Sequence, residues 1–449
     1  MSKKKLVVIG GDAAGMSAAS KVRREQAGRE IVVFEKGRHT SYAACGIPYF
    51  LGGLVEKPEM LIAREPEIFR KKQNIDVRIL HEVVRIDTGE KRVLVDDLSE
   101  GKKFWESYDE LLIATGASPV VPDIDGVNAA GIFALSSLQS GIDLFRFITE
   151  NKPETVVIAG GGYIGIEMAE AMADRGLKVS LIDMAGQVMT TMDEEMTRPV
   201  AEYMVKHGVK VFLGEKLEGF EKDPEGRVRK VLAGSLKLEA GLVILGLGVK
   251  PNSDIAGDAG IATGAGGAIR VNKRQESGTE GIWAAGDCAE SFHLLKDRQV
   301  YVPLGTVANK QGLVAGTNIS GGRAEFPGVL GTAITRFREM EVSRTGLAEK
   351  EAEELGVRYR KTIIESPSRS SYFPGSGKMT VKLIAEEKSG QLIGGQIVGM
   401  HGAAKRIDTV VAAVTAGMTV QQLVDMDLSY APPFSPVWDP VQTAARTLL

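Results

Sequence analysis

Cysteine is scarce in this sequence of 449 residues, which contains only Cys45 and Cys288. Two thiols cannot form the disulfide framework of a small secreted protein, so a reducing compartment, the cytoplasm, is expected. The sequence also lacks a charged-then-apolar leader and any run of about eighteen apolar residues. We therefore expect neither export nor a membrane as partner.

Basic charge is not in excess either, since the formal net charge is -3. A chain with this balance does not attract polyanions, and nucleic acid is not expected as a partner. The five histidines are scattered without metal-ligand spacing, and we predict no metal site. Glycine, in contrast, is frequent at 53 residues and falls at discrete turns, which is typical of a soluble α/β enzyme.

The first glycine turn reads Gly10-Gly11-Asp12-Ala13-Ala14-Gly15 and joins a short apolar strand, 5–9, to a helix over about 16–26. The next strand, 31–34, ends in Glu35. Such a βαβ unit lets the backbone approach a pyrophosphate at the helix start, while the acidic residue accepts hydrogen bonds from a ribose. Asp12 stands where the middle glycine is usual, which weakens this motif.

A second unit begins about 150 residues later and is cleaner. The turn Gly160-Gly161-Gly162-Tyr163-Ile164-Gly165 lies between a strand, 155–159, and a helix, 166–175. Asp183 ends the following strand, 179–182, and no basic residue follows before Thr190. An acidic side chain here favours the free 2′-hydroxyl of NADH over the 2′-phosphate of NADPH.

Two such units in one chain predict two bound dinucleotides. A single glycine turn also occurs merely to pack a helix on a sheet, but two turns with acidic residues at the expected distance are more specific. Two dinucleotides suggest that hydride passes between a nicotinamide and a flavin.

Cys45 is the best candidate for the reactive atom, in the segment Ser41-Tyr-Ala-Ala-Cys-Gly-Ile-Pro-Tyr-Phe-Leu-Gly-Gly53. Pro48 suits the first turn of a helix, and a helix start or an electron-poor ring lowers the pKa of a thiol enough to form the thiolate. The alternative is a small buried apolar residue, which most free cysteines are. Cys288 is expected to be such an inert residue.

Three further motifs carry a resemblance to a known family. They are Ala114-Thr115-Gly116, which lies between the two glycine turns, and two segments after the second turn: 246–252 (Gly-Leu-Gly-Val-Lys-Pro-Asn) and 279–287, which ends in Gly286-Asp287. With these motifs the chain resembles the flavin-dependent pyridine nucleotide-disulfide reductases, the superfamily of glutathione reductase, from about Lys4 to the C-terminus. The resemblance implies two crossings between an FAD and an NAD domain, and an aspartate at 287 that binds the ribityl chain.

Within the superfamily the chain is similar to the single-cysteine branch, which contains coenzyme A-disulfide reductase, NADH oxidase, NADH peroxidase and persulfide reductase. The position five residues after Cys45 is Phe50, where glutathione reductase-like members carry a second cysteine. The resemblance implies that Cys45 cycles through a mixed disulfide or a sulfenic acid. Peroxidases and water-forming oxidases carry a histidine where Ala13 stands, so the acid for oxygen–oxygen cleavage is missing. Coenzyme A-disulfide reductase is therefore the better match.

The resemblance also implies substrate-binding and cofactor-binding residues. Tyr372 and Tyr430 match two tyrosines that the partner subunit places near the cysteine, where a phenol can protonate a leaving thiol. Aromatic packing in an interface is the alternative for both, and solvated surface charge is the alternative for the basic residues. Ala44 replaces an asparagine of some relatives, which puts one substrate hydrogen bond in doubt. The predicted clamps for the polyanionic coenzyme A are Ser17, Lys21, Arg24, Ser41, Lys72 and Asn309.

For the cofactors, FAD and NADH with NADPH possible, Tyr163 resembles the family's gating tyrosine and Glu167 is expected to orient the nicotinamide. The complete set of predicted cofactor-binding residues is Gly10, Gly11, Ala14, Gly15, Glu35, Lys36, Ala114, Thr115, Gly116, Gly286, Asp287, Gly160, Gly162, Tyr163, Ile164, Gly165, Glu167, Asp183 and Gly248.

The expected fold is α/β, with two Rossmann-like domains as in glutathione reductase and a C-terminal α+β dimerisation domain. Alternating segments at 379–384 and 392–398 predict a hairpin there, and helical periodicity follows at 404–416 and 420–426. A homodimer with shared active sites follows from the resemblance. The implied order is an FAD-binding domain over 1–118, an NAD(P)H-binding domain over 119–246, the FAD-binding domain again over 247–324, and the interface domain over 325–449.

The sequence therefore predicts an FAD-dependent NAD(P)H oxidoreductase that reduces coenzyme A disulfide through a Cys45 mixed disulfide. NADH oxidase and persulfide or polysulfide reductase remain alternatives that use the same cysteine. A flavin-binding redox sensor with little turnover is the alternative from a different class.

Overall fold

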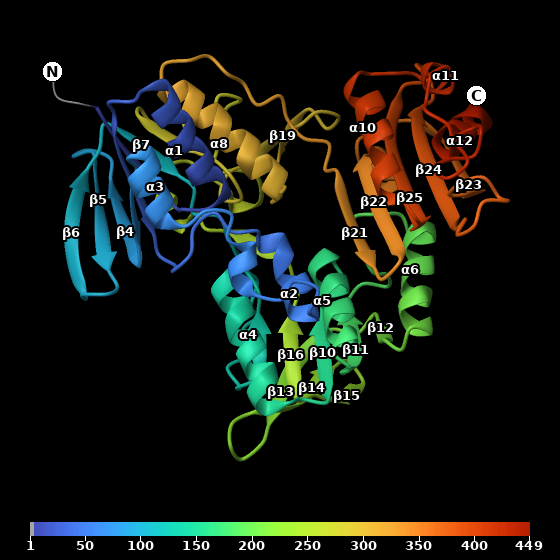
Figure 1. The fold of residues 1–449 in the computed structure, drawn as a ribbon, viewed down its shortest axis with the longest axis horizontal. Coiled ribbons are helices and arrows are strands. Elements are labelled where there is room, and N and C mark those ends of the chain that lie inside the picture. The colour runs from blue at the N-terminus through green and yellow to red at the C-terminus, as the bar shows by residue number, and fades with distance from the viewer. Residues whose placement is uncertain (1–3) are drawn as a thin grey trace.

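The computed structural model describes residues 4–449 (Figure 1). Its first sheet is parallel and five-stranded, with the order β18-β7-β1-β2-β3. Leu6 and Val8 of the central strand face one side of this sheet, and Val7 and Ile9 face the other. All four are buried, as expected for a parallel strand that is covered on both faces. The strands are β1 (Lys5–Ile9), β2 (Glu30–Glu35), β3 (Asp76–Ile79), β7 (Glu110–Ile113) and β18 (Ile282–Ala284).

Two helices that lie far apart in the sequence pack side by side on one face of this sheet, α1 (Ala13–Glu25) and α8 (Gly305–Ile319). Their contact is close, because a Cβ at Gly312 would lie 2.3 Å from the carbonyl oxygen of Ala14. A small antiparallel sheet shares the apolar core on the other face. Its strands are β4 (His81–Asp87), β5 (Arg92–Asp97) and β6 (Lys102–Ser107), and α3 (Pro66–Gln73) precedes β3.

The second parallel sheet repeats this layering, with the order β12-β11-β10-β16-β9. Val156 and Ile158 face the helices, and Val157 and Ala159 face a small antiparallel sheet. The strands of the parallel sheet are β9 (Ile132–Ala134), β10 (Thr155–Ala159), β11 (Lys178–Asp183), β12 (Lys210–Leu213) and β16 (Leu242–Leu245). The covering elements are α4 (Leu138–Asn151), α5 (Tyr163–Asp174), α6 (Glu194–Lys206), β13 (Leu217–Lys222), β14 (Val228–Ala233) and β15 (Leu236–Glu239).

The chain crosses between the two sheets twice, and the two crossings are bonded to each other. Strands β8 (Ala117–Pro119) and β17 (Val249–Pro251) pair antiparallel. The Thr115 hydroxyl donates to the Asn252 carbonyl at 2.6 Å, and the Asn252 side-chain amide donates to the Thr115 carbonyl at 2.8 Å. The two predicted crossing motifs therefore form one junction.

A third sheet, antiparallel, lies at the C-terminal end with the order β21-β22-β25-β24-β23. Lys382 of this sheet is fully buried and pairs with Asp193 and Glu195 at 2.6 Å each, which joins the sheet to the start of α6. The strands are β21 (Ala333–Phe337), β22 (Met340–Gly346), β23 (Tyr359–Pro367), β24 (Lys378–Glu386) and β25 (Leu392–Met400). The helices here are α9 (Glu349–Glu354), α10 (Ile407–Thr415), α11 (Val420–Val424) and α12 (Pro440–Leu448).

The predicted α/β architecture, with two Rossmann-like parts and a C-terminal α+β part, is confirmed, whereas the domain boundaries at 118, 246 and 324 stay predictions. The helices after the two glycine turns begin at Ala13 and Tyr163, three residues earlier than predicted, because the last glycine of each turn lies inside the helix. Within 4–449 no helix is long and apolar enough to cross a membrane. The remaining short elements are α2 (Ile47–Gly52), α7 (Asp254–Asp258), β19 (Ser291–His293) and β20 (Arg298–Val300).

Candidate active site

The first glycine turn has the backbone geometry of a nucleotide cradle. Gly10 has φ of +107°, and a Cβ at Gly15 would lie only 2.0 Å from the Gly10 carbonyl oxygen, so neither position accepts a side chain. The Glu35 carboxylate accepts the N–H of Gly11 and of Gly37, both at 2.7 Å. This brings the acidic end of β2 against the turn, as the motif predicts.

The second turn has nearly the same geometry. Gly160 has φ of +109°, and a Cβ at Gly165 would lie 1.9 Å from the Gly160 carbonyl oxygen. The Asp183 carboxylate accepts the N–H of Gly161 at 2.6 Å and of Ala185 at 2.7 Å. Nothing lies within 4 Å of a Cβ built on Gly162, which leaves open space at the helix start.

The residues around both turns fit dinucleotides. The carboxylate of Asp287 receives no hydrogen bond from residues 4–449, and burial raises its pKa to about 6. A largely enclosed acceptor beside the first turn suits the hydroxyl groups of a ribityl chain. Gly286 donates its N–H to Gln311 at 2.8 Å, which fixes this strand end against α8. Sequence reasoning missed Gln311, because nothing in its local pattern marks it.

Cys45 lies on an exposed turn directly before α2, and its segment is held by backbone hydrogen bonds. Ser41 donates to the Gly11 carbonyl at 3.1 Å, and Ala43 donates to the Leu61 carbonyl at 2.8 Å. Gly46 donates to Ala43 at 2.8 Å, which closes a 3₁₀ turn around Cys45. The predicted helix start after Cys45 is therefore present.

The expected lowering of the Cys45 pKa is wrong for the polypeptide alone. Although the thiol is open to solvent on one side, protein encloses the other, and burial raises its pKa. The carboxylates of Glu167 and Asp287 add to the rise. The protein groups around Cys45 therefore favour the thiol over the thiolate.

The Cys45 segment packs on the second nucleotide unit, because α2 lies beside α5 (Figure 1). A Cβ at Gly52 would lie 3.3 Å from the Cα of Ala171, and the Arg175 side chain donates to the Leu51 carbonyl. Glu167, on the same helix α5, accepts a hydrogen bond from Thr335 at 2.9 Å. Cys45 and Glu167 are thus brought together from the two nucleotide units. Cys288, in contrast, is fully buried in the apolar core of the first sheet.

Tyr163 begins α5 and lies between the second turn and the C-terminal sheet. Its hydroxyl is 3.4 Å from that of Thr191, and burial raises its pKa. Its neighbour Ile164 is exposed. The buried Arg344 donates to the Thr191 carbonyl, so the residue that meets Tyr163 is held by the C-terminal sheet.

The predicted substrate-binding residues fall into two groups. Ser17 and Asn309 are joined, since the Ser17 hydroxyl donates to the Asn309 side-chain oxygen at 2.9 Å across α1 and α8. Lys21 pairs instead with Glu25 at 2.6 Å. The structure brings the others into no described contact with these: Ser41 lies in the Cys45 segment, and Arg24, Lys72 and the cofactor candidate Lys36 are exposed.

Tyr372 and Tyr430 lie on the C-terminal part, with exposed fractions of 75% and 46%. Within residues 4–449 of one chain, no hydrogen bond joins either phenol to Cys45. Phe434 and Trp438, which follow Tyr430 in the sequence, are also exposed, at 75% and 45%. The Ser370 N–H donates to the Pro432 carbonyl at 3.2 Å, which brings the segment of Tyr372 beside them. An uncovered group of large aromatic side chains of this kind marks a surface that meets another molecule.

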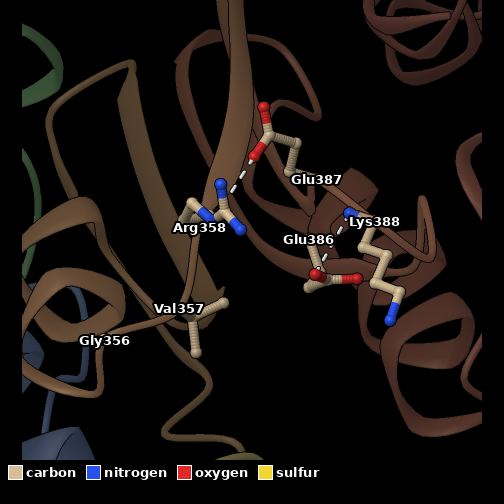
Figure 2. Close-up of a pocket in the computed structure, with 6 residues that line it drawn as sticks. All are labelled: Gly356, Val357, Arg358, Glu386, Glu387 and Lys388. Carbon is tan, nitrogen blue, oxygen red and sulfur yellow. Dashed lines mark hydrogen bonds and ion pairs between the residues drawn. The ribbon is translucent and has the colours of Figure 1, made fainter.

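A hollow on the surface of the C-terminal part is not part of this site. It lies beside α9 and the turn after β24, where Arg358 Nε is 3.9 Å from Glu387 Oε2 (Figure 2). A surface ion pair of this kind contributes little. Cys45 is absent from the lining, which consists of Gly356, Val357, Arg358, Glu386, Glu387 and Lys388.

Asp12 is a second residue whose role sequence reasoning missed. Its carboxylate accepts the N–H of Tyr42 at 3.2 Å, so it joins the first glycine turn to the Cys45 segment. The departure from glycine at this position is the sequence signal that marks it.

Comparison with known proteins gives two family matches. A sequence model described as pyridine nucleotide-disulphide oxidoreductase matches residues 4–312, and the dimerisation domain of the same group matches residues 332–440.

Individual relatives match over nearly the whole length of this chain. The NAD(P)H coenzyme A polysulfide/persulfide reductase of Pyrococcus horikoshii is 43% identical, covering 99% of this chain and 98% of the relative. The coenzyme A disulfide reductase of Staphylococcus aureus strain MW2 is 30% identical, covering 96% of each. The solved structure of an NAD-dependent persulfide reductase from A. fulgidus aligns with a TM-score of 0.95 and 39% identity, covering 99% of this chain and 82% of that one.

Proposed function

Because this chain belongs to the pyridine nucleotide-disulphide oxidoreductase family, whose enzymes use FAD and NAD(P)H, we propose that it reduces a sulfur–sulfur bond carried on coenzyme A. Cys45 is the reactive thiol. NADH is the preferred electron donor, because Asp183 occupies the place where a 2′-phosphate would need a cation.

The single observation that carries this proposal is the position of Cys45 between the two nucleotide cradles. The Cys45 segment is hydrogen-bonded to the first glycine turn through the Ser41 N–H, and α2 packs on α5, which begins at the second turn. A thiol at such a junction can exchange electrons with a flavin held by the first turn. FAD, when bound, carries an electron pair from the nicotinamide to sulfur.

The sulfur chemistry needs one covalent exchange. The Cys45 thiolate attacks a sulfur of coenzyme A disulfide, so that a Cys45–coenzyme A disulfide forms and one coenzyme A thiolate leaves and takes up a proton. Two electrons, which come from NAD(P)H, then cleave the mixed disulfide. Its products are the Cys45 thiolate and a second coenzyme A thiol, which takes up one proton.

Proton transfer to the leaving sulfur is assigned to a second subunit. Burial and nearby carboxylates raise the pKa of Cys45, so its thiolate needs stabilisation from outside these groups. Tyr372 and Tyr430 are exposed in the part of the chain that matches a dimerisation domain. In the dimer, each pair of phenols serves the Cys45 of the other subunit.

Coenzyme A itself is bound by the group around α1. Its phosphates need cations, and Lys21 and Arg24 lie on α1 beside the hydrogen-bonded pair of Ser17 and Asn309. Ser41 and Lys72 are the further candidates. Because Lys21 is paired with Glu25 by a partly exposed salt bridge, a phosphate needs to displace little to reach it.

A coenzyme A persulfide is a second acceptor, supported by the relatives from Pyrococcus horikoshii and A. fulgidus. Attack of Cys45 on its inner sulfur forms the same mixed disulfide and releases hydrosulfide. The two acceptors therefore share every later step. Reduction of oxygen has less support, because Ala13 supplies no proton donor in the first turn.

Native mass measurement of the purified protein, before and after thiol reduction, tests the proposal. A mass loss on reduction that equals one coenzyme A per subunit, located on Cys45, is the expected result. Rates with coenzyme A disulfide, coenzyme A persulfide and oxygen as competing acceptors then rank the substrates. A flavin-bound protein that turns over none of them has the behaviour of a redox sensor and contradicts the proposal.

A further inference from the structure

Asp12 occupies the one glycine position of the motif at which the first turn departs from the second. It precedes α1 as the N-cap residue, and Gly162 holds the same place before α5. The space around Gly162 is open to 4 Å, whereas the first turn carries a carboxylate there. An acidic group at the start of the helix that receives a pyrophosphate requires an explanation.

The Asp12 side chain is part of the attachment of the Cys45 segment. Its Oδ1 accepts the N–H of Tyr42 at 3.2 Å, next to the bond from the Ser41 N–H to the Gly11 carbonyl at 3.1 Å. Tyr42 lies three residues before Cys45. Asp12 is therefore the side chain through which the turn holds the segment that carries the thiol.

The surroundings of Asp12 disfavour its ionised form. Burial raises its pKa to about 7, and the carboxylates of Glu35 from β2 and Asp287 from the segment after β18 act in the same direction. The titratable groups of the Cys45 segment, Tyr42 and Cys45, also face it. Only backbone N–H groups act in the opposite direction among the described causes, that of Tyr42 first.

We propose that Asp12 joins the FAD cradle to Cys45 and that its carboxyl takes up a proton when FAD binds. This inference rests on the proposed function, because it requires FAD at the first glycine turn. The pyrophosphate brings two negative charges to the helix start that Asp12 precedes, and a neutral carboxyl avoids their repulsion while still accepting the Tyr42 N–H. Glycine at this place would avoid the repulsion but would lose the bond.

The proposal fixes the sign of a pH effect. A proton taken up on binding makes FAD affinity highest below pH about 7, where Asp12 is already neutral. Above this pH, each unit weakens FAD binding by up to about tenfold, because a proton must first be supplied. Asp287 has a raised pKa as well and contributes its own slope, so the comparison of variants, not the slope alone, is decisive.

The experiment uses the yellow holoenzyme diluted to nanomolar concentration between pH about 6 and 9, with released FAD measured by its fluorescence. For the wild type, the logarithm of the FAD dissociation constant should rise with pH more steeply than for Asp12→Asn, and the difference in slope should approach one, which corresponds to one proton. Asp12→Asn keeps the hydrogen-bond acceptor and removes the charge. Asp123→Asn, a change at an exposed carboxylate, is the matched control and should follow the wild type. Equal slopes for wild type and Asp12→Asn overturn the proposal.

A second variant separates the two roles of Asp12. Asp12→Gly removes both the charge and the bond, so its FAD release should be as insensitive to pH as that of Asp12→Asn. The rate at which iodoacetamide alkylates Cys45 should differ severalfold between Asp12→Gly and the wild type, whereas Asp12→Asn should have nearly the wild-type rate. If Asp12→Asn does not fold, Asp12→Ser supplies another uncharged acceptor for the same measurement.

The outcomes distinguish this inference from the proposed function. Wild-type protein that purifies colourless and takes up no FAD contradicts the proposed function. Protein that binds FAD and reduces sulfur, but whose FAD affinity has the same pH slope with and without Asp12, contradicts only the inference.

Discussion

The two glycine turns of this chain have nearly the same backbone conformation but contact different neighbouring segments. Gly10 and Gly160 have φ of +107° and +109°, and the last glycine of each turn is pressed against the carbonyl oxygen of the first. Each turn also receives a carboxylate, from Glu35 or from Asp183. The first turn, however, carries the Cys45 segment, while the second leaves its helix start open.

This difference indicates that the two similar units bind their nucleotides for different lengths of time. A cradle whose N-cap carboxylate is hydrogen-bonded to a neighbouring segment is suited to a cofactor that stays bound, because cofactor and thiol are then positioned together. An open helix start, as at Gly162, suits a nucleotide that must enter and leave during each turnover. Four predictions separate the two units, from the largest expected effect to the smallest.

Removal of the Cys45 sulfur should abolish disulfide reduction and leave flavin reduction by NADH intact. In Cys45→Ser, disulfide reduction is expected to fall by about 10⁴-fold or more, as for other enzymes that lose their nucleophile. NADH should still bleach the flavin in a rapid-mixing experiment, because the hydride step uses the second unit. Cys288→Ala, at the buried thiol, is the control and should keep near-normal turnover. Full disulfide reduction by Cys45→Ser would falsify the role of Cys45.

The Cys45 site of the first unit is expected to need two side chains from a second subunit, whereas the second unit needs none. Phe at both Tyr372 and Tyr430 should reduce turnover by about a hundredfold, the lower range for loss of a proton donor. Mixed dimers with Cys45→Ser in one chain and both Phe changes in the other contain one intact site if the phenols act across the interface. Such dimers should recover about half of the activity per dimer. Dimers that stay inactive indicate that the phenols act within one chain.

A single methyl group should disable either cradle separately. Gly15→Ala and Gly165→Ala place a Cβ about 2 Å from a backbone oxygen, which cannot move aside as a side chain could. Overpacking of this kind costs about 1 to 3 kcal/mol, which corresponds to a loss of about fivefold to about 150-fold in binding. The first variant should purify with less FAD, and the second should keep its FAD but need more NADH. Visible absorbance and the KM for NADH measure the two effects, and loss of FAD from both variants equally would contradict the assignment.

The smallest effect is expected at the acidic end of β11. Asp183→Asn keeps an acceptor but loses the charge, so the KM for NADH should rise by about tenfold at unchanged kcat, as for one charge-assisted hydrogen bond. The KM for NADPH serves as the internal control and should stay equal or fall. An equal rise for both nucleotides means that Asp183 supports the turn only through the N–H groups of Gly161 and Ala185.

Local sequence pattern was sufficient for the strands of both units. Residues 5–9 and 155–159 form β1 and β10 as predicted, because short β-branched runs covered on both faces have few other conformations. Helix starts were placed three residues late, since glycine is usually a helix breaker and the packing that requires Gly15 and Gly165 inside a helix depends on the tertiary fold.

The remaining features of the site depend on contacts between distant segments. The bond from Ser17 to Asn309 spans 292 residues, and neither side chain has a local pattern that marks it. The raised pKa of Cys45 arises from burial and from the carboxylates of Glu167 and Asp287. The packing of α2 on α5 brings Glu167 near Cys45, and the pairing of β18 with β7 positions Asp287. The helix predicted over 404–416 begins instead as a 3₁₀ turn and continues as α10 from Ile407.

The most direct test of the central claim is an anaerobic titration with NADH of two proteins, the wild type loaded with coenzyme A disulfide and then freed of excess, and Cys45→Ser treated in the same way. Visible absorbance follows the flavin, and mass measurement follows coenzyme A on Cys45. The wild type should consume about one more NADH per subunit than Cys45→Ser before the flavin stays bleached, and should release one coenzyme A as it does so, because the mixed disulfide accepts one electron pair. Equal consumption by both proteins, with coenzyme A still attached to Cys45 after the flavin is bleached, would contradict the account.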